Sequence, residues 1–297
     1  MKANLLMISA ALISILLCIL CLLIFKILQK RIQRRSPLDG RQVGHVPGQQ
    51  LVARVENSQD DMMMSVMCMF LSFPLMLQAW AISNLSPNQF QFDKSDFVFI
   101  LGALLMFGFG LRSFIKNWRI RQNAKDGLLA ERVTGMQLNR LVAQNCIVMH
   151  DLPCENFNID HVVISPRGVY AVETKSFRKP KNAIDEKHYN VVFDGNTLRF
   201  PDFVEKSAVA QAERQALWLS KLLKESLALD IHVTPALALP GWHVQQTDDV
   251  WRSSKTKVFT PMGSGANFMA KELNRIDLSQ RSLISKALAI RYPNITD

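Results

Sequence analysis

Three long apolar runs constrain the fold of this chain more than any other feature. They extend over residues 5–25, 62–82 and 97–115. Each is close to the roughly 20 apolar residues that a helix needs to cross a bilayer. We therefore expect three transmembrane helices, the first within residues 1–28 and the other two forming a helical hairpin over residues 62–115.

Two alternatives to these spans remain open. The first run can be a signal peptide, but it is longer than a usual signal-peptide core, and no small-residue cleavage site follows it before the basic cluster at Lys30 and Arg31. The second and third runs can be a buried helical hairpin of a soluble fold. Their length and the charges that flank them favour membrane spans.

Basic residues flank the runs unevenly. Seven Lys or Arg residues lie within residues 26–61, one lies in the loop 83–96, and four follow the third run between residues 116 and 125. Because basic segments stay on the cytoplasmic side, the N-terminus and the loop 83–96 are expected outside. The connector 29–61, rich in Pro and Gly and expected to be flexible, and residues 116–297 are then cytoplasmic. We expect a multi-pass protein of a bacterial inner (cytoplasmic) membrane.

The overall composition agrees with this division. The chain of 297 residues is 48% hydrophobic and has a net charge of +10, which suits anionic partners such as nucleic acid or acidic lipid. Three of the five cysteines lie in apolar runs, so they do not form a disulfide framework. This pattern fits a reducing compartment for the soluble part.

The pattern after residue 116 is typical of an α/β domain. We expect a mixed sheet flanked by helices and followed by C-terminal helices. In chain order the expected elements are a helix over 127–142, a strand over 147–149, hairpins over 159–175 and 190–200, a helix over 208–227, strands over 231–239 and 258–259, and helices over 265–273 and 278–291.

The first hairpin gathers charged residues. Its turn is Ser165–Gly168, which contains the turn formers Pro and Gly between two apolar runs. With the turn centred there, Val162 faces Ala171 and Asp160 faces Glu173. Strand residues alternate between faces, so Lys175 lies on the face of these two carboxylates. Directly opposed side chains are about 5 Å apart, which brings the two carboxylates into close contact.

Two carboxylates at that distance repel each other unless a proton or cation lies between them. A divalent metal, Mg²⁺ or Mn²⁺, is expected to be held by Asp160, Glu173 and the backbone carbonyl of Thr174. Lys175 would then assist the attacking water or stabilise charge on a phosphate. The alternative is an exposed hairpin end whose carboxylates are hydrated or paired with Lys175.

Other residues can join this site. Glu131, from the first helix of the domain, can complete the carboxylate set, and Gln211, from the second, can orient the water or a phosphate. His161 is expected on the opposite face of the strand, in a structural role. The basic segment Arg178–Lys181 follows the hairpin, where it can meet phosphates or form a solvated loop.

The hairpin residues resemble a known family. The segments Ile159-Asp160-His161-Val162-Val163, Gly168-Val169-Tyr170 and Val172-Glu173-Thr174-Lys175-Ser176 resemble the nuclease-related domain, NERD, which is similar to PD-(D/E)XK nucleases. The resemblance extends from about residue 125 to 240 and includes Glu131 and Gln211. Two positions depart from the family pattern: Ala130 replaces the Gly before Glu131, and Val209-Ala210 replaces the Asn-Pro that often precedes Gln211.

The resemblance implies a metal-dependent nuclease that is anchored in a membrane and hydrolyses phosphodiester bonds, with DNA as the expected substrate. A catalytically inactive, nuclease-like module that holds nucleic acid or a protein partner at the membrane is the alternative. The sequence does not indicate an oligomeric state.

Overall fold

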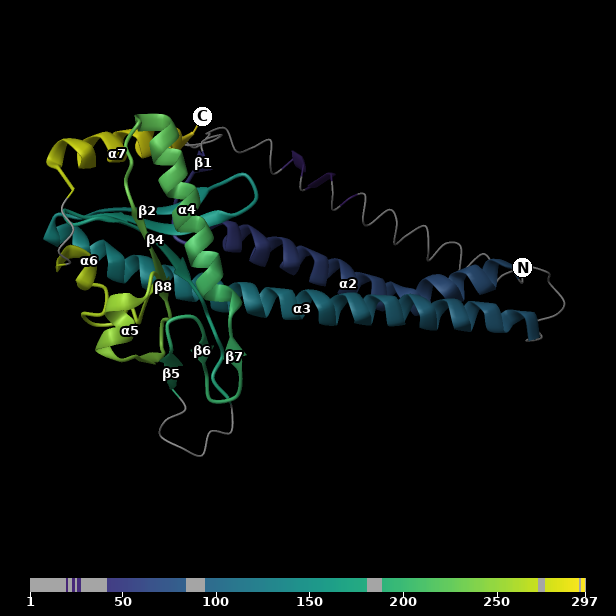
Figure 1. Cartoon of the computed structure of the whole chain (residues 1–297). Helices are drawn as coiled ribbons and strands as arrows, with labels where there is room; N and C mark the ends of the chain where they lie inside the picture. Colours follow the sequence, from purple (N-terminus) through teal and green to yellow (C-terminus); the bar gives the residue numbers. More distant parts are fainter. Residues whose placement is uncertain are drawn as a thin grey trace. The chain divides into compact units, whose positions relative to one another are not determined.

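The structure is a computed structural model in which the chain forms two compact units (Figure 1). The helical unit contains Gln59–Trp118, and the α/β unit contains Gln42–Ser58 and Arg119–Thr296. The residues that the structure describes are Leu20, Leu23, Ile24, Lys26, Ile27, 42–83, 94–180, 189–271, 276–293 and 295–296. Most of the expected first span, 1–28, and residues 29–41 of the expected connector therefore lie outside the described residues.

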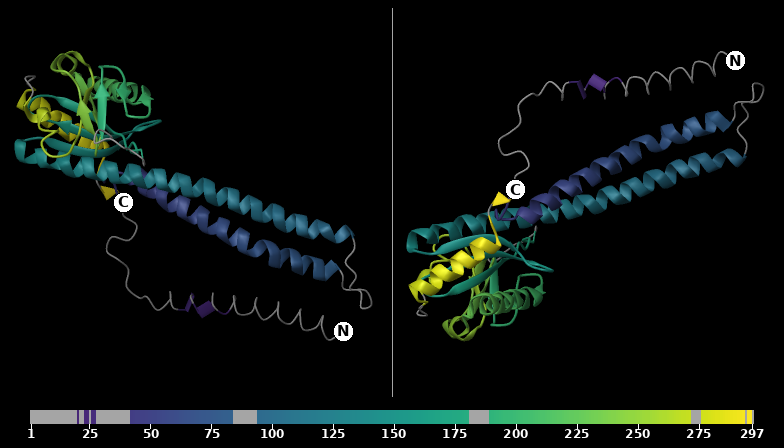
Figure 2. Two further views of the ribbon diagram at one scale, coloured as in Figure 1. Left: turned by 90° about the horizontal axis from the view of Figure 1, so that it is seen from below. Right: turned by 90° about the horizontal axis from the view of Figure 1, so that it is seen from above.

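The helical unit consists of parts of two long helices, α2 (Gln49–Ser83) and α3 (Phe97–Asn139), which lie side by side (Figure 2). A short 3-10 helix, η1 (Lys94–Asp96), precedes α3. The helices approach closely at Gly110, where a Cβ atom would lie 2.7 Å from Met69 Cγ. Ser65 Oγ donates a hydrogen bond to Ser113 Oγ at 2.9 Å, so small residues bring the two helices together.

The surface of this unit is apolar. Phe70 is 77% exposed and Phe109 71% exposed. Both helices are long and apolar enough to cross a membrane, and only 11% of each apolar window is buried. These two helices correspond to the second and third expected spans; within the described part of the chain there are two candidate spans, not three.

The main sheet of the α/β unit has the strand order β10-β8-β4-β3-β2. Its strands are β2 (Ile147–Pro153), β3 (Asn158–Ile164), β4 (Val169–Thr174), β8 (Val233–Ala238) and β10 (Lys257–Phe259). Strands β10, β8 and β4 are parallel, whereas β4, β3 and β2 are antiparallel, so the sheet is mixed as expected.

Helices cover both faces of this sheet. On one face, α4 (Ser207–Leu227) and α7 (Leu278–Arg291) pack against Val162 and Ala171 in one core cluster. On the other face, the end of α3, the 3-10 helix η2 (Arg140–Gln144) and α6 (Phe268–Lys271) pack against Val163 and Val172. Alternating hydrophobic side chains of the hairpin therefore fill two separate cores.

A second mixed sheet has the order β7-β6-β5-β9 and adjoins the third core cluster. Its strands are β5 (Asn190–Phe193), β6 (Leu198–Arg199), β7 (Val204–Glu205) and β9 (His243–Gln245). The remaining elements are α5 (Asp248–Ser253) and the pair of β1 (Gln42–Val43) with β11 (Ile295–Thr296).

The helix boundaries differ from the sequence prediction in two places. Residues 49–61, expected as flexible connector, form the start of α2, because no Pro or Gly follows Gly48 in this stretch. The third apolar run and the helix expected at 127–142 form the single helix α3, because the residues between them include no Pro and are mostly good helix formers.

Smaller differences occur in the strands. β2 continues through residues expected to be a loop, and β7, β9 and α5 were not expected. The helix expected at 265–273 is reduced to α6. The second hairpin turns at Gly195-Asn196 rather than at Asp194-Gly195, because Gly195 has φ +103° and Asp194 accepts hydrogen bonds from Asn196 N and Thr197 N.

Two leucines of α4 provide a test of this packing. Leu219 is fully buried in the first core cluster, whereas Leu217 is 73% exposed. We expect Leu219→Ala to lower the free energy of unfolding by about 2–5 kcal/mol and Leu217→Ala to change it by less than about 0.5 kcal/mol. Unfolding of the full chain in detergent, followed by circular dichroism, measures both. Equal effects would contradict the orientation of α4.

Candidate active site

The turn of the first hairpin fixes the register that the sequence predicts. Ser165 N donates to Gly168 O at 2.9 Å, and Ser165 Oγ accepts from Arg167 N and Gly168 N. The register pairs Val162 with Ala171, as expected. Continuing the same count places Asp160 opposite Glu173, at the end of the hairpin away from the turn.

Asp160 and Glu173 are both buried, being 5% and 3% exposed. Asp160 Oδ2 accepts a hydrogen bond from Thr174 N at 2.7 Å, so its carboxylate reaches diagonally across the hairpin. Lys175 Nζ lies 2.7 Å from Glu173 Oε1. The two carboxylates and the amine therefore meet at one end of the hairpin, as the sequence predicts.

Helix α4 supplies two neutral donors to Glu173. Gln211 Nε2 donates to Glu173 Oε1 at 2.7 Å, and Gln215 Nε2 donates to Glu173 Oε2 at 2.5 Å. The structure thus places Gln211 in the site even though its preceding residues depart from the family pattern. Its amide contacts a carboxylate, whereas the sequence suggested contact with a water or a phosphate.

Sequence reasoning missed Gln215. It is 2% exposed, and its Nε2 also donates to Asn158 O at 3.0 Å. Its Oε1 is buried and has no hydrogen-bond partner among the described residues. The available signal was helical spacing, because Gln215 lies four residues after Gln211 and so on the same helix face.

Glu131 reaches the site from α3 and is 8% exposed. Burial, together with the negative charges of Asp151 and Glu173, raises the pKa of Glu131 from its ordinary value of 4.5 to about 7, against the opposing effect of Lys175. The backbone of Gly48, with φ +76°, passes close by, since a Cβ there would lie 3.5 Å from Glu131 Oε2. The segment before α2 therefore forms part of the wall around Glu131.

The same crowding acts on Asp160. Its pKa is raised well above its ordinary value by burial and by the charges of Glu173 and Glu131, while the hydrogen bond from Thr174 N and the charge of Lys175 oppose the shift. Three carboxylates from α3, β3 and β4 thus compete for a proton or a cation.

Asp151 is a further acid that sequence reasoning missed. It is 5% exposed and has φ +47°, a conformation that interrupts the pairing of β2 with β3. Its Oδ1 accepts from Asn158 Nδ2 at 2.8 Å, and its carbonyl interacts with His45 Nδ1 at 2.9 Å. The sequence carries no clear signal for it, because the effect of Asp151 on Glu131 depends on tertiary placement.

His161 lies away from this cluster. Its Nδ1 is 2.8 Å from His150 Nδ1, and His150 Nε2 is 3.1 Å from Asn139 Oδ1, on the face covered by the end of α3. Burial lowers the pKa of His150 to about 4 and that of His161 well below its ordinary value. Both imidazoles are thus neutral at neutral pH, which agrees with the structural role expected of His161.

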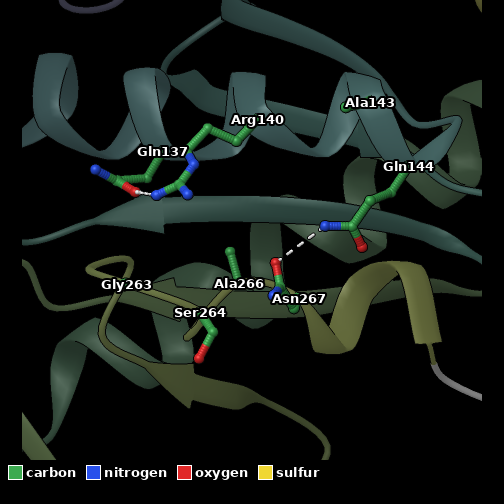
Figure 3. A pocket seen from close by; sticks show the side chains of 8 residues that line it. All are labelled: Gln137, Arg140, Ala143, Gln144, Gly263, Ser264, Ala266 and Asn267. Atoms are coloured by element: carbon green, nitrogen blue, oxygen red, sulfur yellow. Dashed lines mark hydrogen bonds between the residues drawn. The ribbon is translucent and has the colours of Figure 1, made fainter.

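A pocket of about 520 Å³ opens elsewhere on the α/β unit (Figure 3). Gln144 Nε2 donates to Asn267 Oδ1 and Arg140 Nη1 to Gln137 Oε1, each at 3.2 Å. None of the described residues that line it is acidic, and Arg140 contributes a positive charge to it. Its lining residues are Gln137, Arg140, Ala143, Gln144, Gly263, Ser264, Ala266 and Asn267, and none of them is a predicted site residue.

A comparison with known protein families agrees with the location of this site in the chain. Residues 126–240 match the nuclease-related domain, NERD. The matched region contains Glu131, the hairpin with Asp160, Glu173 and Lys175, and Gln211. No curated protein and no solved structure gives a significant match.

The NERD-matching region can be tested for its fit to a divalent cation. Within the described residues, no three His, Cys, Asp or Glu side chains are arranged to hold a metal by themselves. Mg²⁺, however, is commonly bound by one or two carboxylates with water and substrate phosphates completing its shell. Asp160 and Glu173 are hard oxygen donors whose burial and mutual repulsion a cation would relieve. The donor set therefore fits Mg²⁺ or Mn²⁺.

The raised pKa of Glu131 predicts how stability depends on pH. The folded state holds an extra proton between about pH 4.5 and 7, so in EDTA this group lowers stability as pH rises through that window. We therefore compare the free energy of unfolding of Glu131→Gln with that of the wild type at each pH. This difference is expected to shift in favour of the variant from pH 4 to pH 8, by up to about 3 kcal/mol. Urea unfolding of the full chain at both pH values measures this difference.

A matched control is Glu225→Gln on α4, whose side chain is 63% exposed. We expect its stability relative to wild type to be the same at both pH values. If the difference in unfolding free energy between Glu131→Gln and the wild type is the same at pH 4 and pH 8, the buried, crowded environment of Glu131 is contradicted.

Proposed function

We propose that the α/β unit is a metal-dependent nuclease that hydrolyses phosphodiester bonds, with DNA as the expected substrate. The observation that carries the proposal is the meeting of Asp160, Glu173 and Lys175 at one end of the hairpin. Glu131 and Gln211, delivered by separate helices, join them. The match of residues 126–240 to NERD supports nucleic acid as the substrate class.

In this proposal Asp160, Glu173 and the carbonyl of Thr174 hold Mg²⁺ or Mn²⁺. The ion would polarise the phosphate and lower the pKa of a bound water. Gln211 and Gln215 orient Glu173 by donating to its two oxygens. Lys175, whose side chain is 30% exposed, can turn from Glu173 toward the phosphate and stabilise the charge that develops there.

The helical unit supports attachment to a membrane. Its exposed apolar surface is stable in a bilayer, whereas in water it would be costly. We propose a multi-pass protein of a bacterial inner membrane with the α/β unit in the cytoplasm, on the basis of the basic residues that flank the apolar runs.

A non-catalytic module that holds nucleic acid or a protein partner at the membrane is the second candidate. The observation that favours it is that the Glu173 carboxylate already interacts with Lys175, Gln211 and Gln215. Such a module would bind its partner without metal and without cleavage. The two experiments that follow separate the candidates.

The first experiment tests the role of Lys175. The full chain is purified in detergent, because Gln42–Ser58 belongs to the α/β unit and removing it would expose the site. We expect cleavage of labelled DNA with Mg²⁺ or Mn²⁺ and none with EDTA. We expect Lys175→Ala to slow cleavage by about a hundredfold or more, a typical loss for a group that assists proton transfer or charge stabilisation.

Lys221→Ala is the matched control, because Lys221 is an exposed lysine of α4 whose Nζ lies 3.7 Å from Glu225 Oε1. Its cleavage rate is expected to equal that of the wild type. Equal cleavage by Lys175→Ala and wild type would exclude the assigned mechanism, and parallel reactions with RNA identify the preferred polymer.

The second experiment tests the metal site without requiring activity. Binding of a cation between Asp160 and Glu173 would relieve their repulsion, so Mg²⁺ is expected to raise the melting temperature of the full chain at pH 8. Asp160→Asn is expected to abolish this rise. Asp230→Asn, which changes an exposed carboxylate paired with Lys224, is expected to retain it. A rise of equal size in Asp160→Asn would point to another metal site and favour the non-catalytic module.

A further inference from the structure

The chain that leaves the active site is held in place. Beyond Lys175, the carbonyl of Phe177 accepts a hydrogen bond from Trp242 Nε1 at 3.0 Å. The Phe177 ring packs against Phe200 and Phe203, with centroid distances of 4.7 and 5.7 Å. Lys179 follows Phe177 by two residues and Lys175 by four. The Cα atoms of Lys175 and Lys179 are therefore at most about 14 Å apart.

The two cations of this segment have different surroundings. Arg178 Nε lies 2.6 Å from Asp126 Oδ2, which neutralises its charge. Lys179 Nζ instead lies 5.9 Å from the ring centroid of Tyr189 and 5.7 Å from that of Trp242. In the part of the chain that the structure describes, no acidic side chain forms an ion pair with Lys179. As far as the described residues go, its positive charge is available to an anionic ligand.

An exposed aromatic surface adjoins Lys179. Tyr189 is 42% exposed, whereas Trp242, the other ring near Lys179, is 2% exposed. His243, also exposed, donates its backbone N–H to Tyr189 O at 2.8 Å, and the two rings lie 6.3 Å apart. The start of β9 thus places the His243 ring beside the Tyr189 ring, and the Tyr189 ring adjoins the ammonium group of Lys179.

We propose that Lys179, Tyr189 and His243 form a binding surface for unpaired nucleotides, here called the nucleotide platform. A ring with an exposed surface can stack on a base, and a lysine without an acidic partner can contact the adjoining phosphate. In a duplex the bases are already stacked on one another, so the platform selects single-stranded nucleic acid. The inference deepens the proposed nuclease function, on which it rests, by naming the form of the substrate strand.

Binding without cleavage tests the platform. The full chain in detergent is titrated, in EDTA, into fluorescent single-stranded DNA, single-stranded RNA and duplex DNA, and anisotropy is recorded at several salt concentrations. We expect both single strands to bind more tightly than the duplex. Tyr189→Ala is expected to weaken single-strand binding by about tenfold, while Tyr189→Phe, which retains the ring, binds like the wild type.

The salt dependence tests Lys179 separately. Each phosphate contact contributes about 0.7 to the slope of log K against log salt for a single strand. Lys179→Gln is expected to reduce the slope by about this amount. Lys286 is an exposed lysine of α7, and Lys286→Gln removes the same charge as Lys179→Gln. This control variant is expected to leave the slope unaltered.

The outcomes distinguish the platform from the nuclease proposal. Metal-dependent cleavage together with binding that Tyr189→Ala and Lys179→Gln do not affect would overturn the platform alone. Binding that depends on both residues, without cleavage under any condition, would keep the platform and remove the nuclease. Tighter binding of duplex than of single strands would overturn the assigned substrate form. The absence of all binding in EDTA would overturn the platform, whereas the nuclease proposal is decided by the cleavage experiment with Mg²⁺ or Mn²⁺.

Discussion

Three carboxylates buried at one end of a β-hairpin set the conditions for the rest of the α/β unit. Glu131, Asp160 and Glu173 are each less than a tenth exposed, and burial of ionised groups is costly unless donors or cations surround them. The donors come from separate elements: Lys175 and Thr174 N from the hairpin and two glutamines from α4. The sheet and both helix layers are thus needed to assemble one site.

The hairpin was predictable because its determinants are local. A short turn containing Pro and Gly sets the register, and alternation then places Asp160, Glu173 and Lys175 on one face. Gln215 was predictable in principle from its helical spacing to Gln211. Asp151 was not, because its φ of +47° and its effect on Glu131 arise from contacts between segments distant in sequence.

The boundaries of α2 and α3 show that side-chain polarity alone does not decide where a helix begins or ends. The change from apolar to polar residues near 115 and 61 predicts the ends of structural elements there, but both helices continue across it. Backbone hydrogen bonds in a helix do not depend on side-chain polarity, so a helix can continue across such a change where most residues are good helix formers. Accordingly α3 extends without interruption from Phe97 to Asn139, and α2 begins directly after Gly48.

The nature of the donors to Glu173 bears on how the site can work. Among the residues that the structure describes, Lys175 is its single charged partner, and the two glutamines are neutral. If Lys175 moves toward a phosphate, Glu173 keeps one hydrogen bond to each carboxylate oxygen and is not left buried without partners. The exposed fraction of the Lys175 side chain, 30% against 4% for Glu173, gives it room for that movement. The pairing seen between Lys175 and Glu173 is therefore compatible with the proposed catalysis, because the glutamines can hold the carboxylate when the lysine moves away.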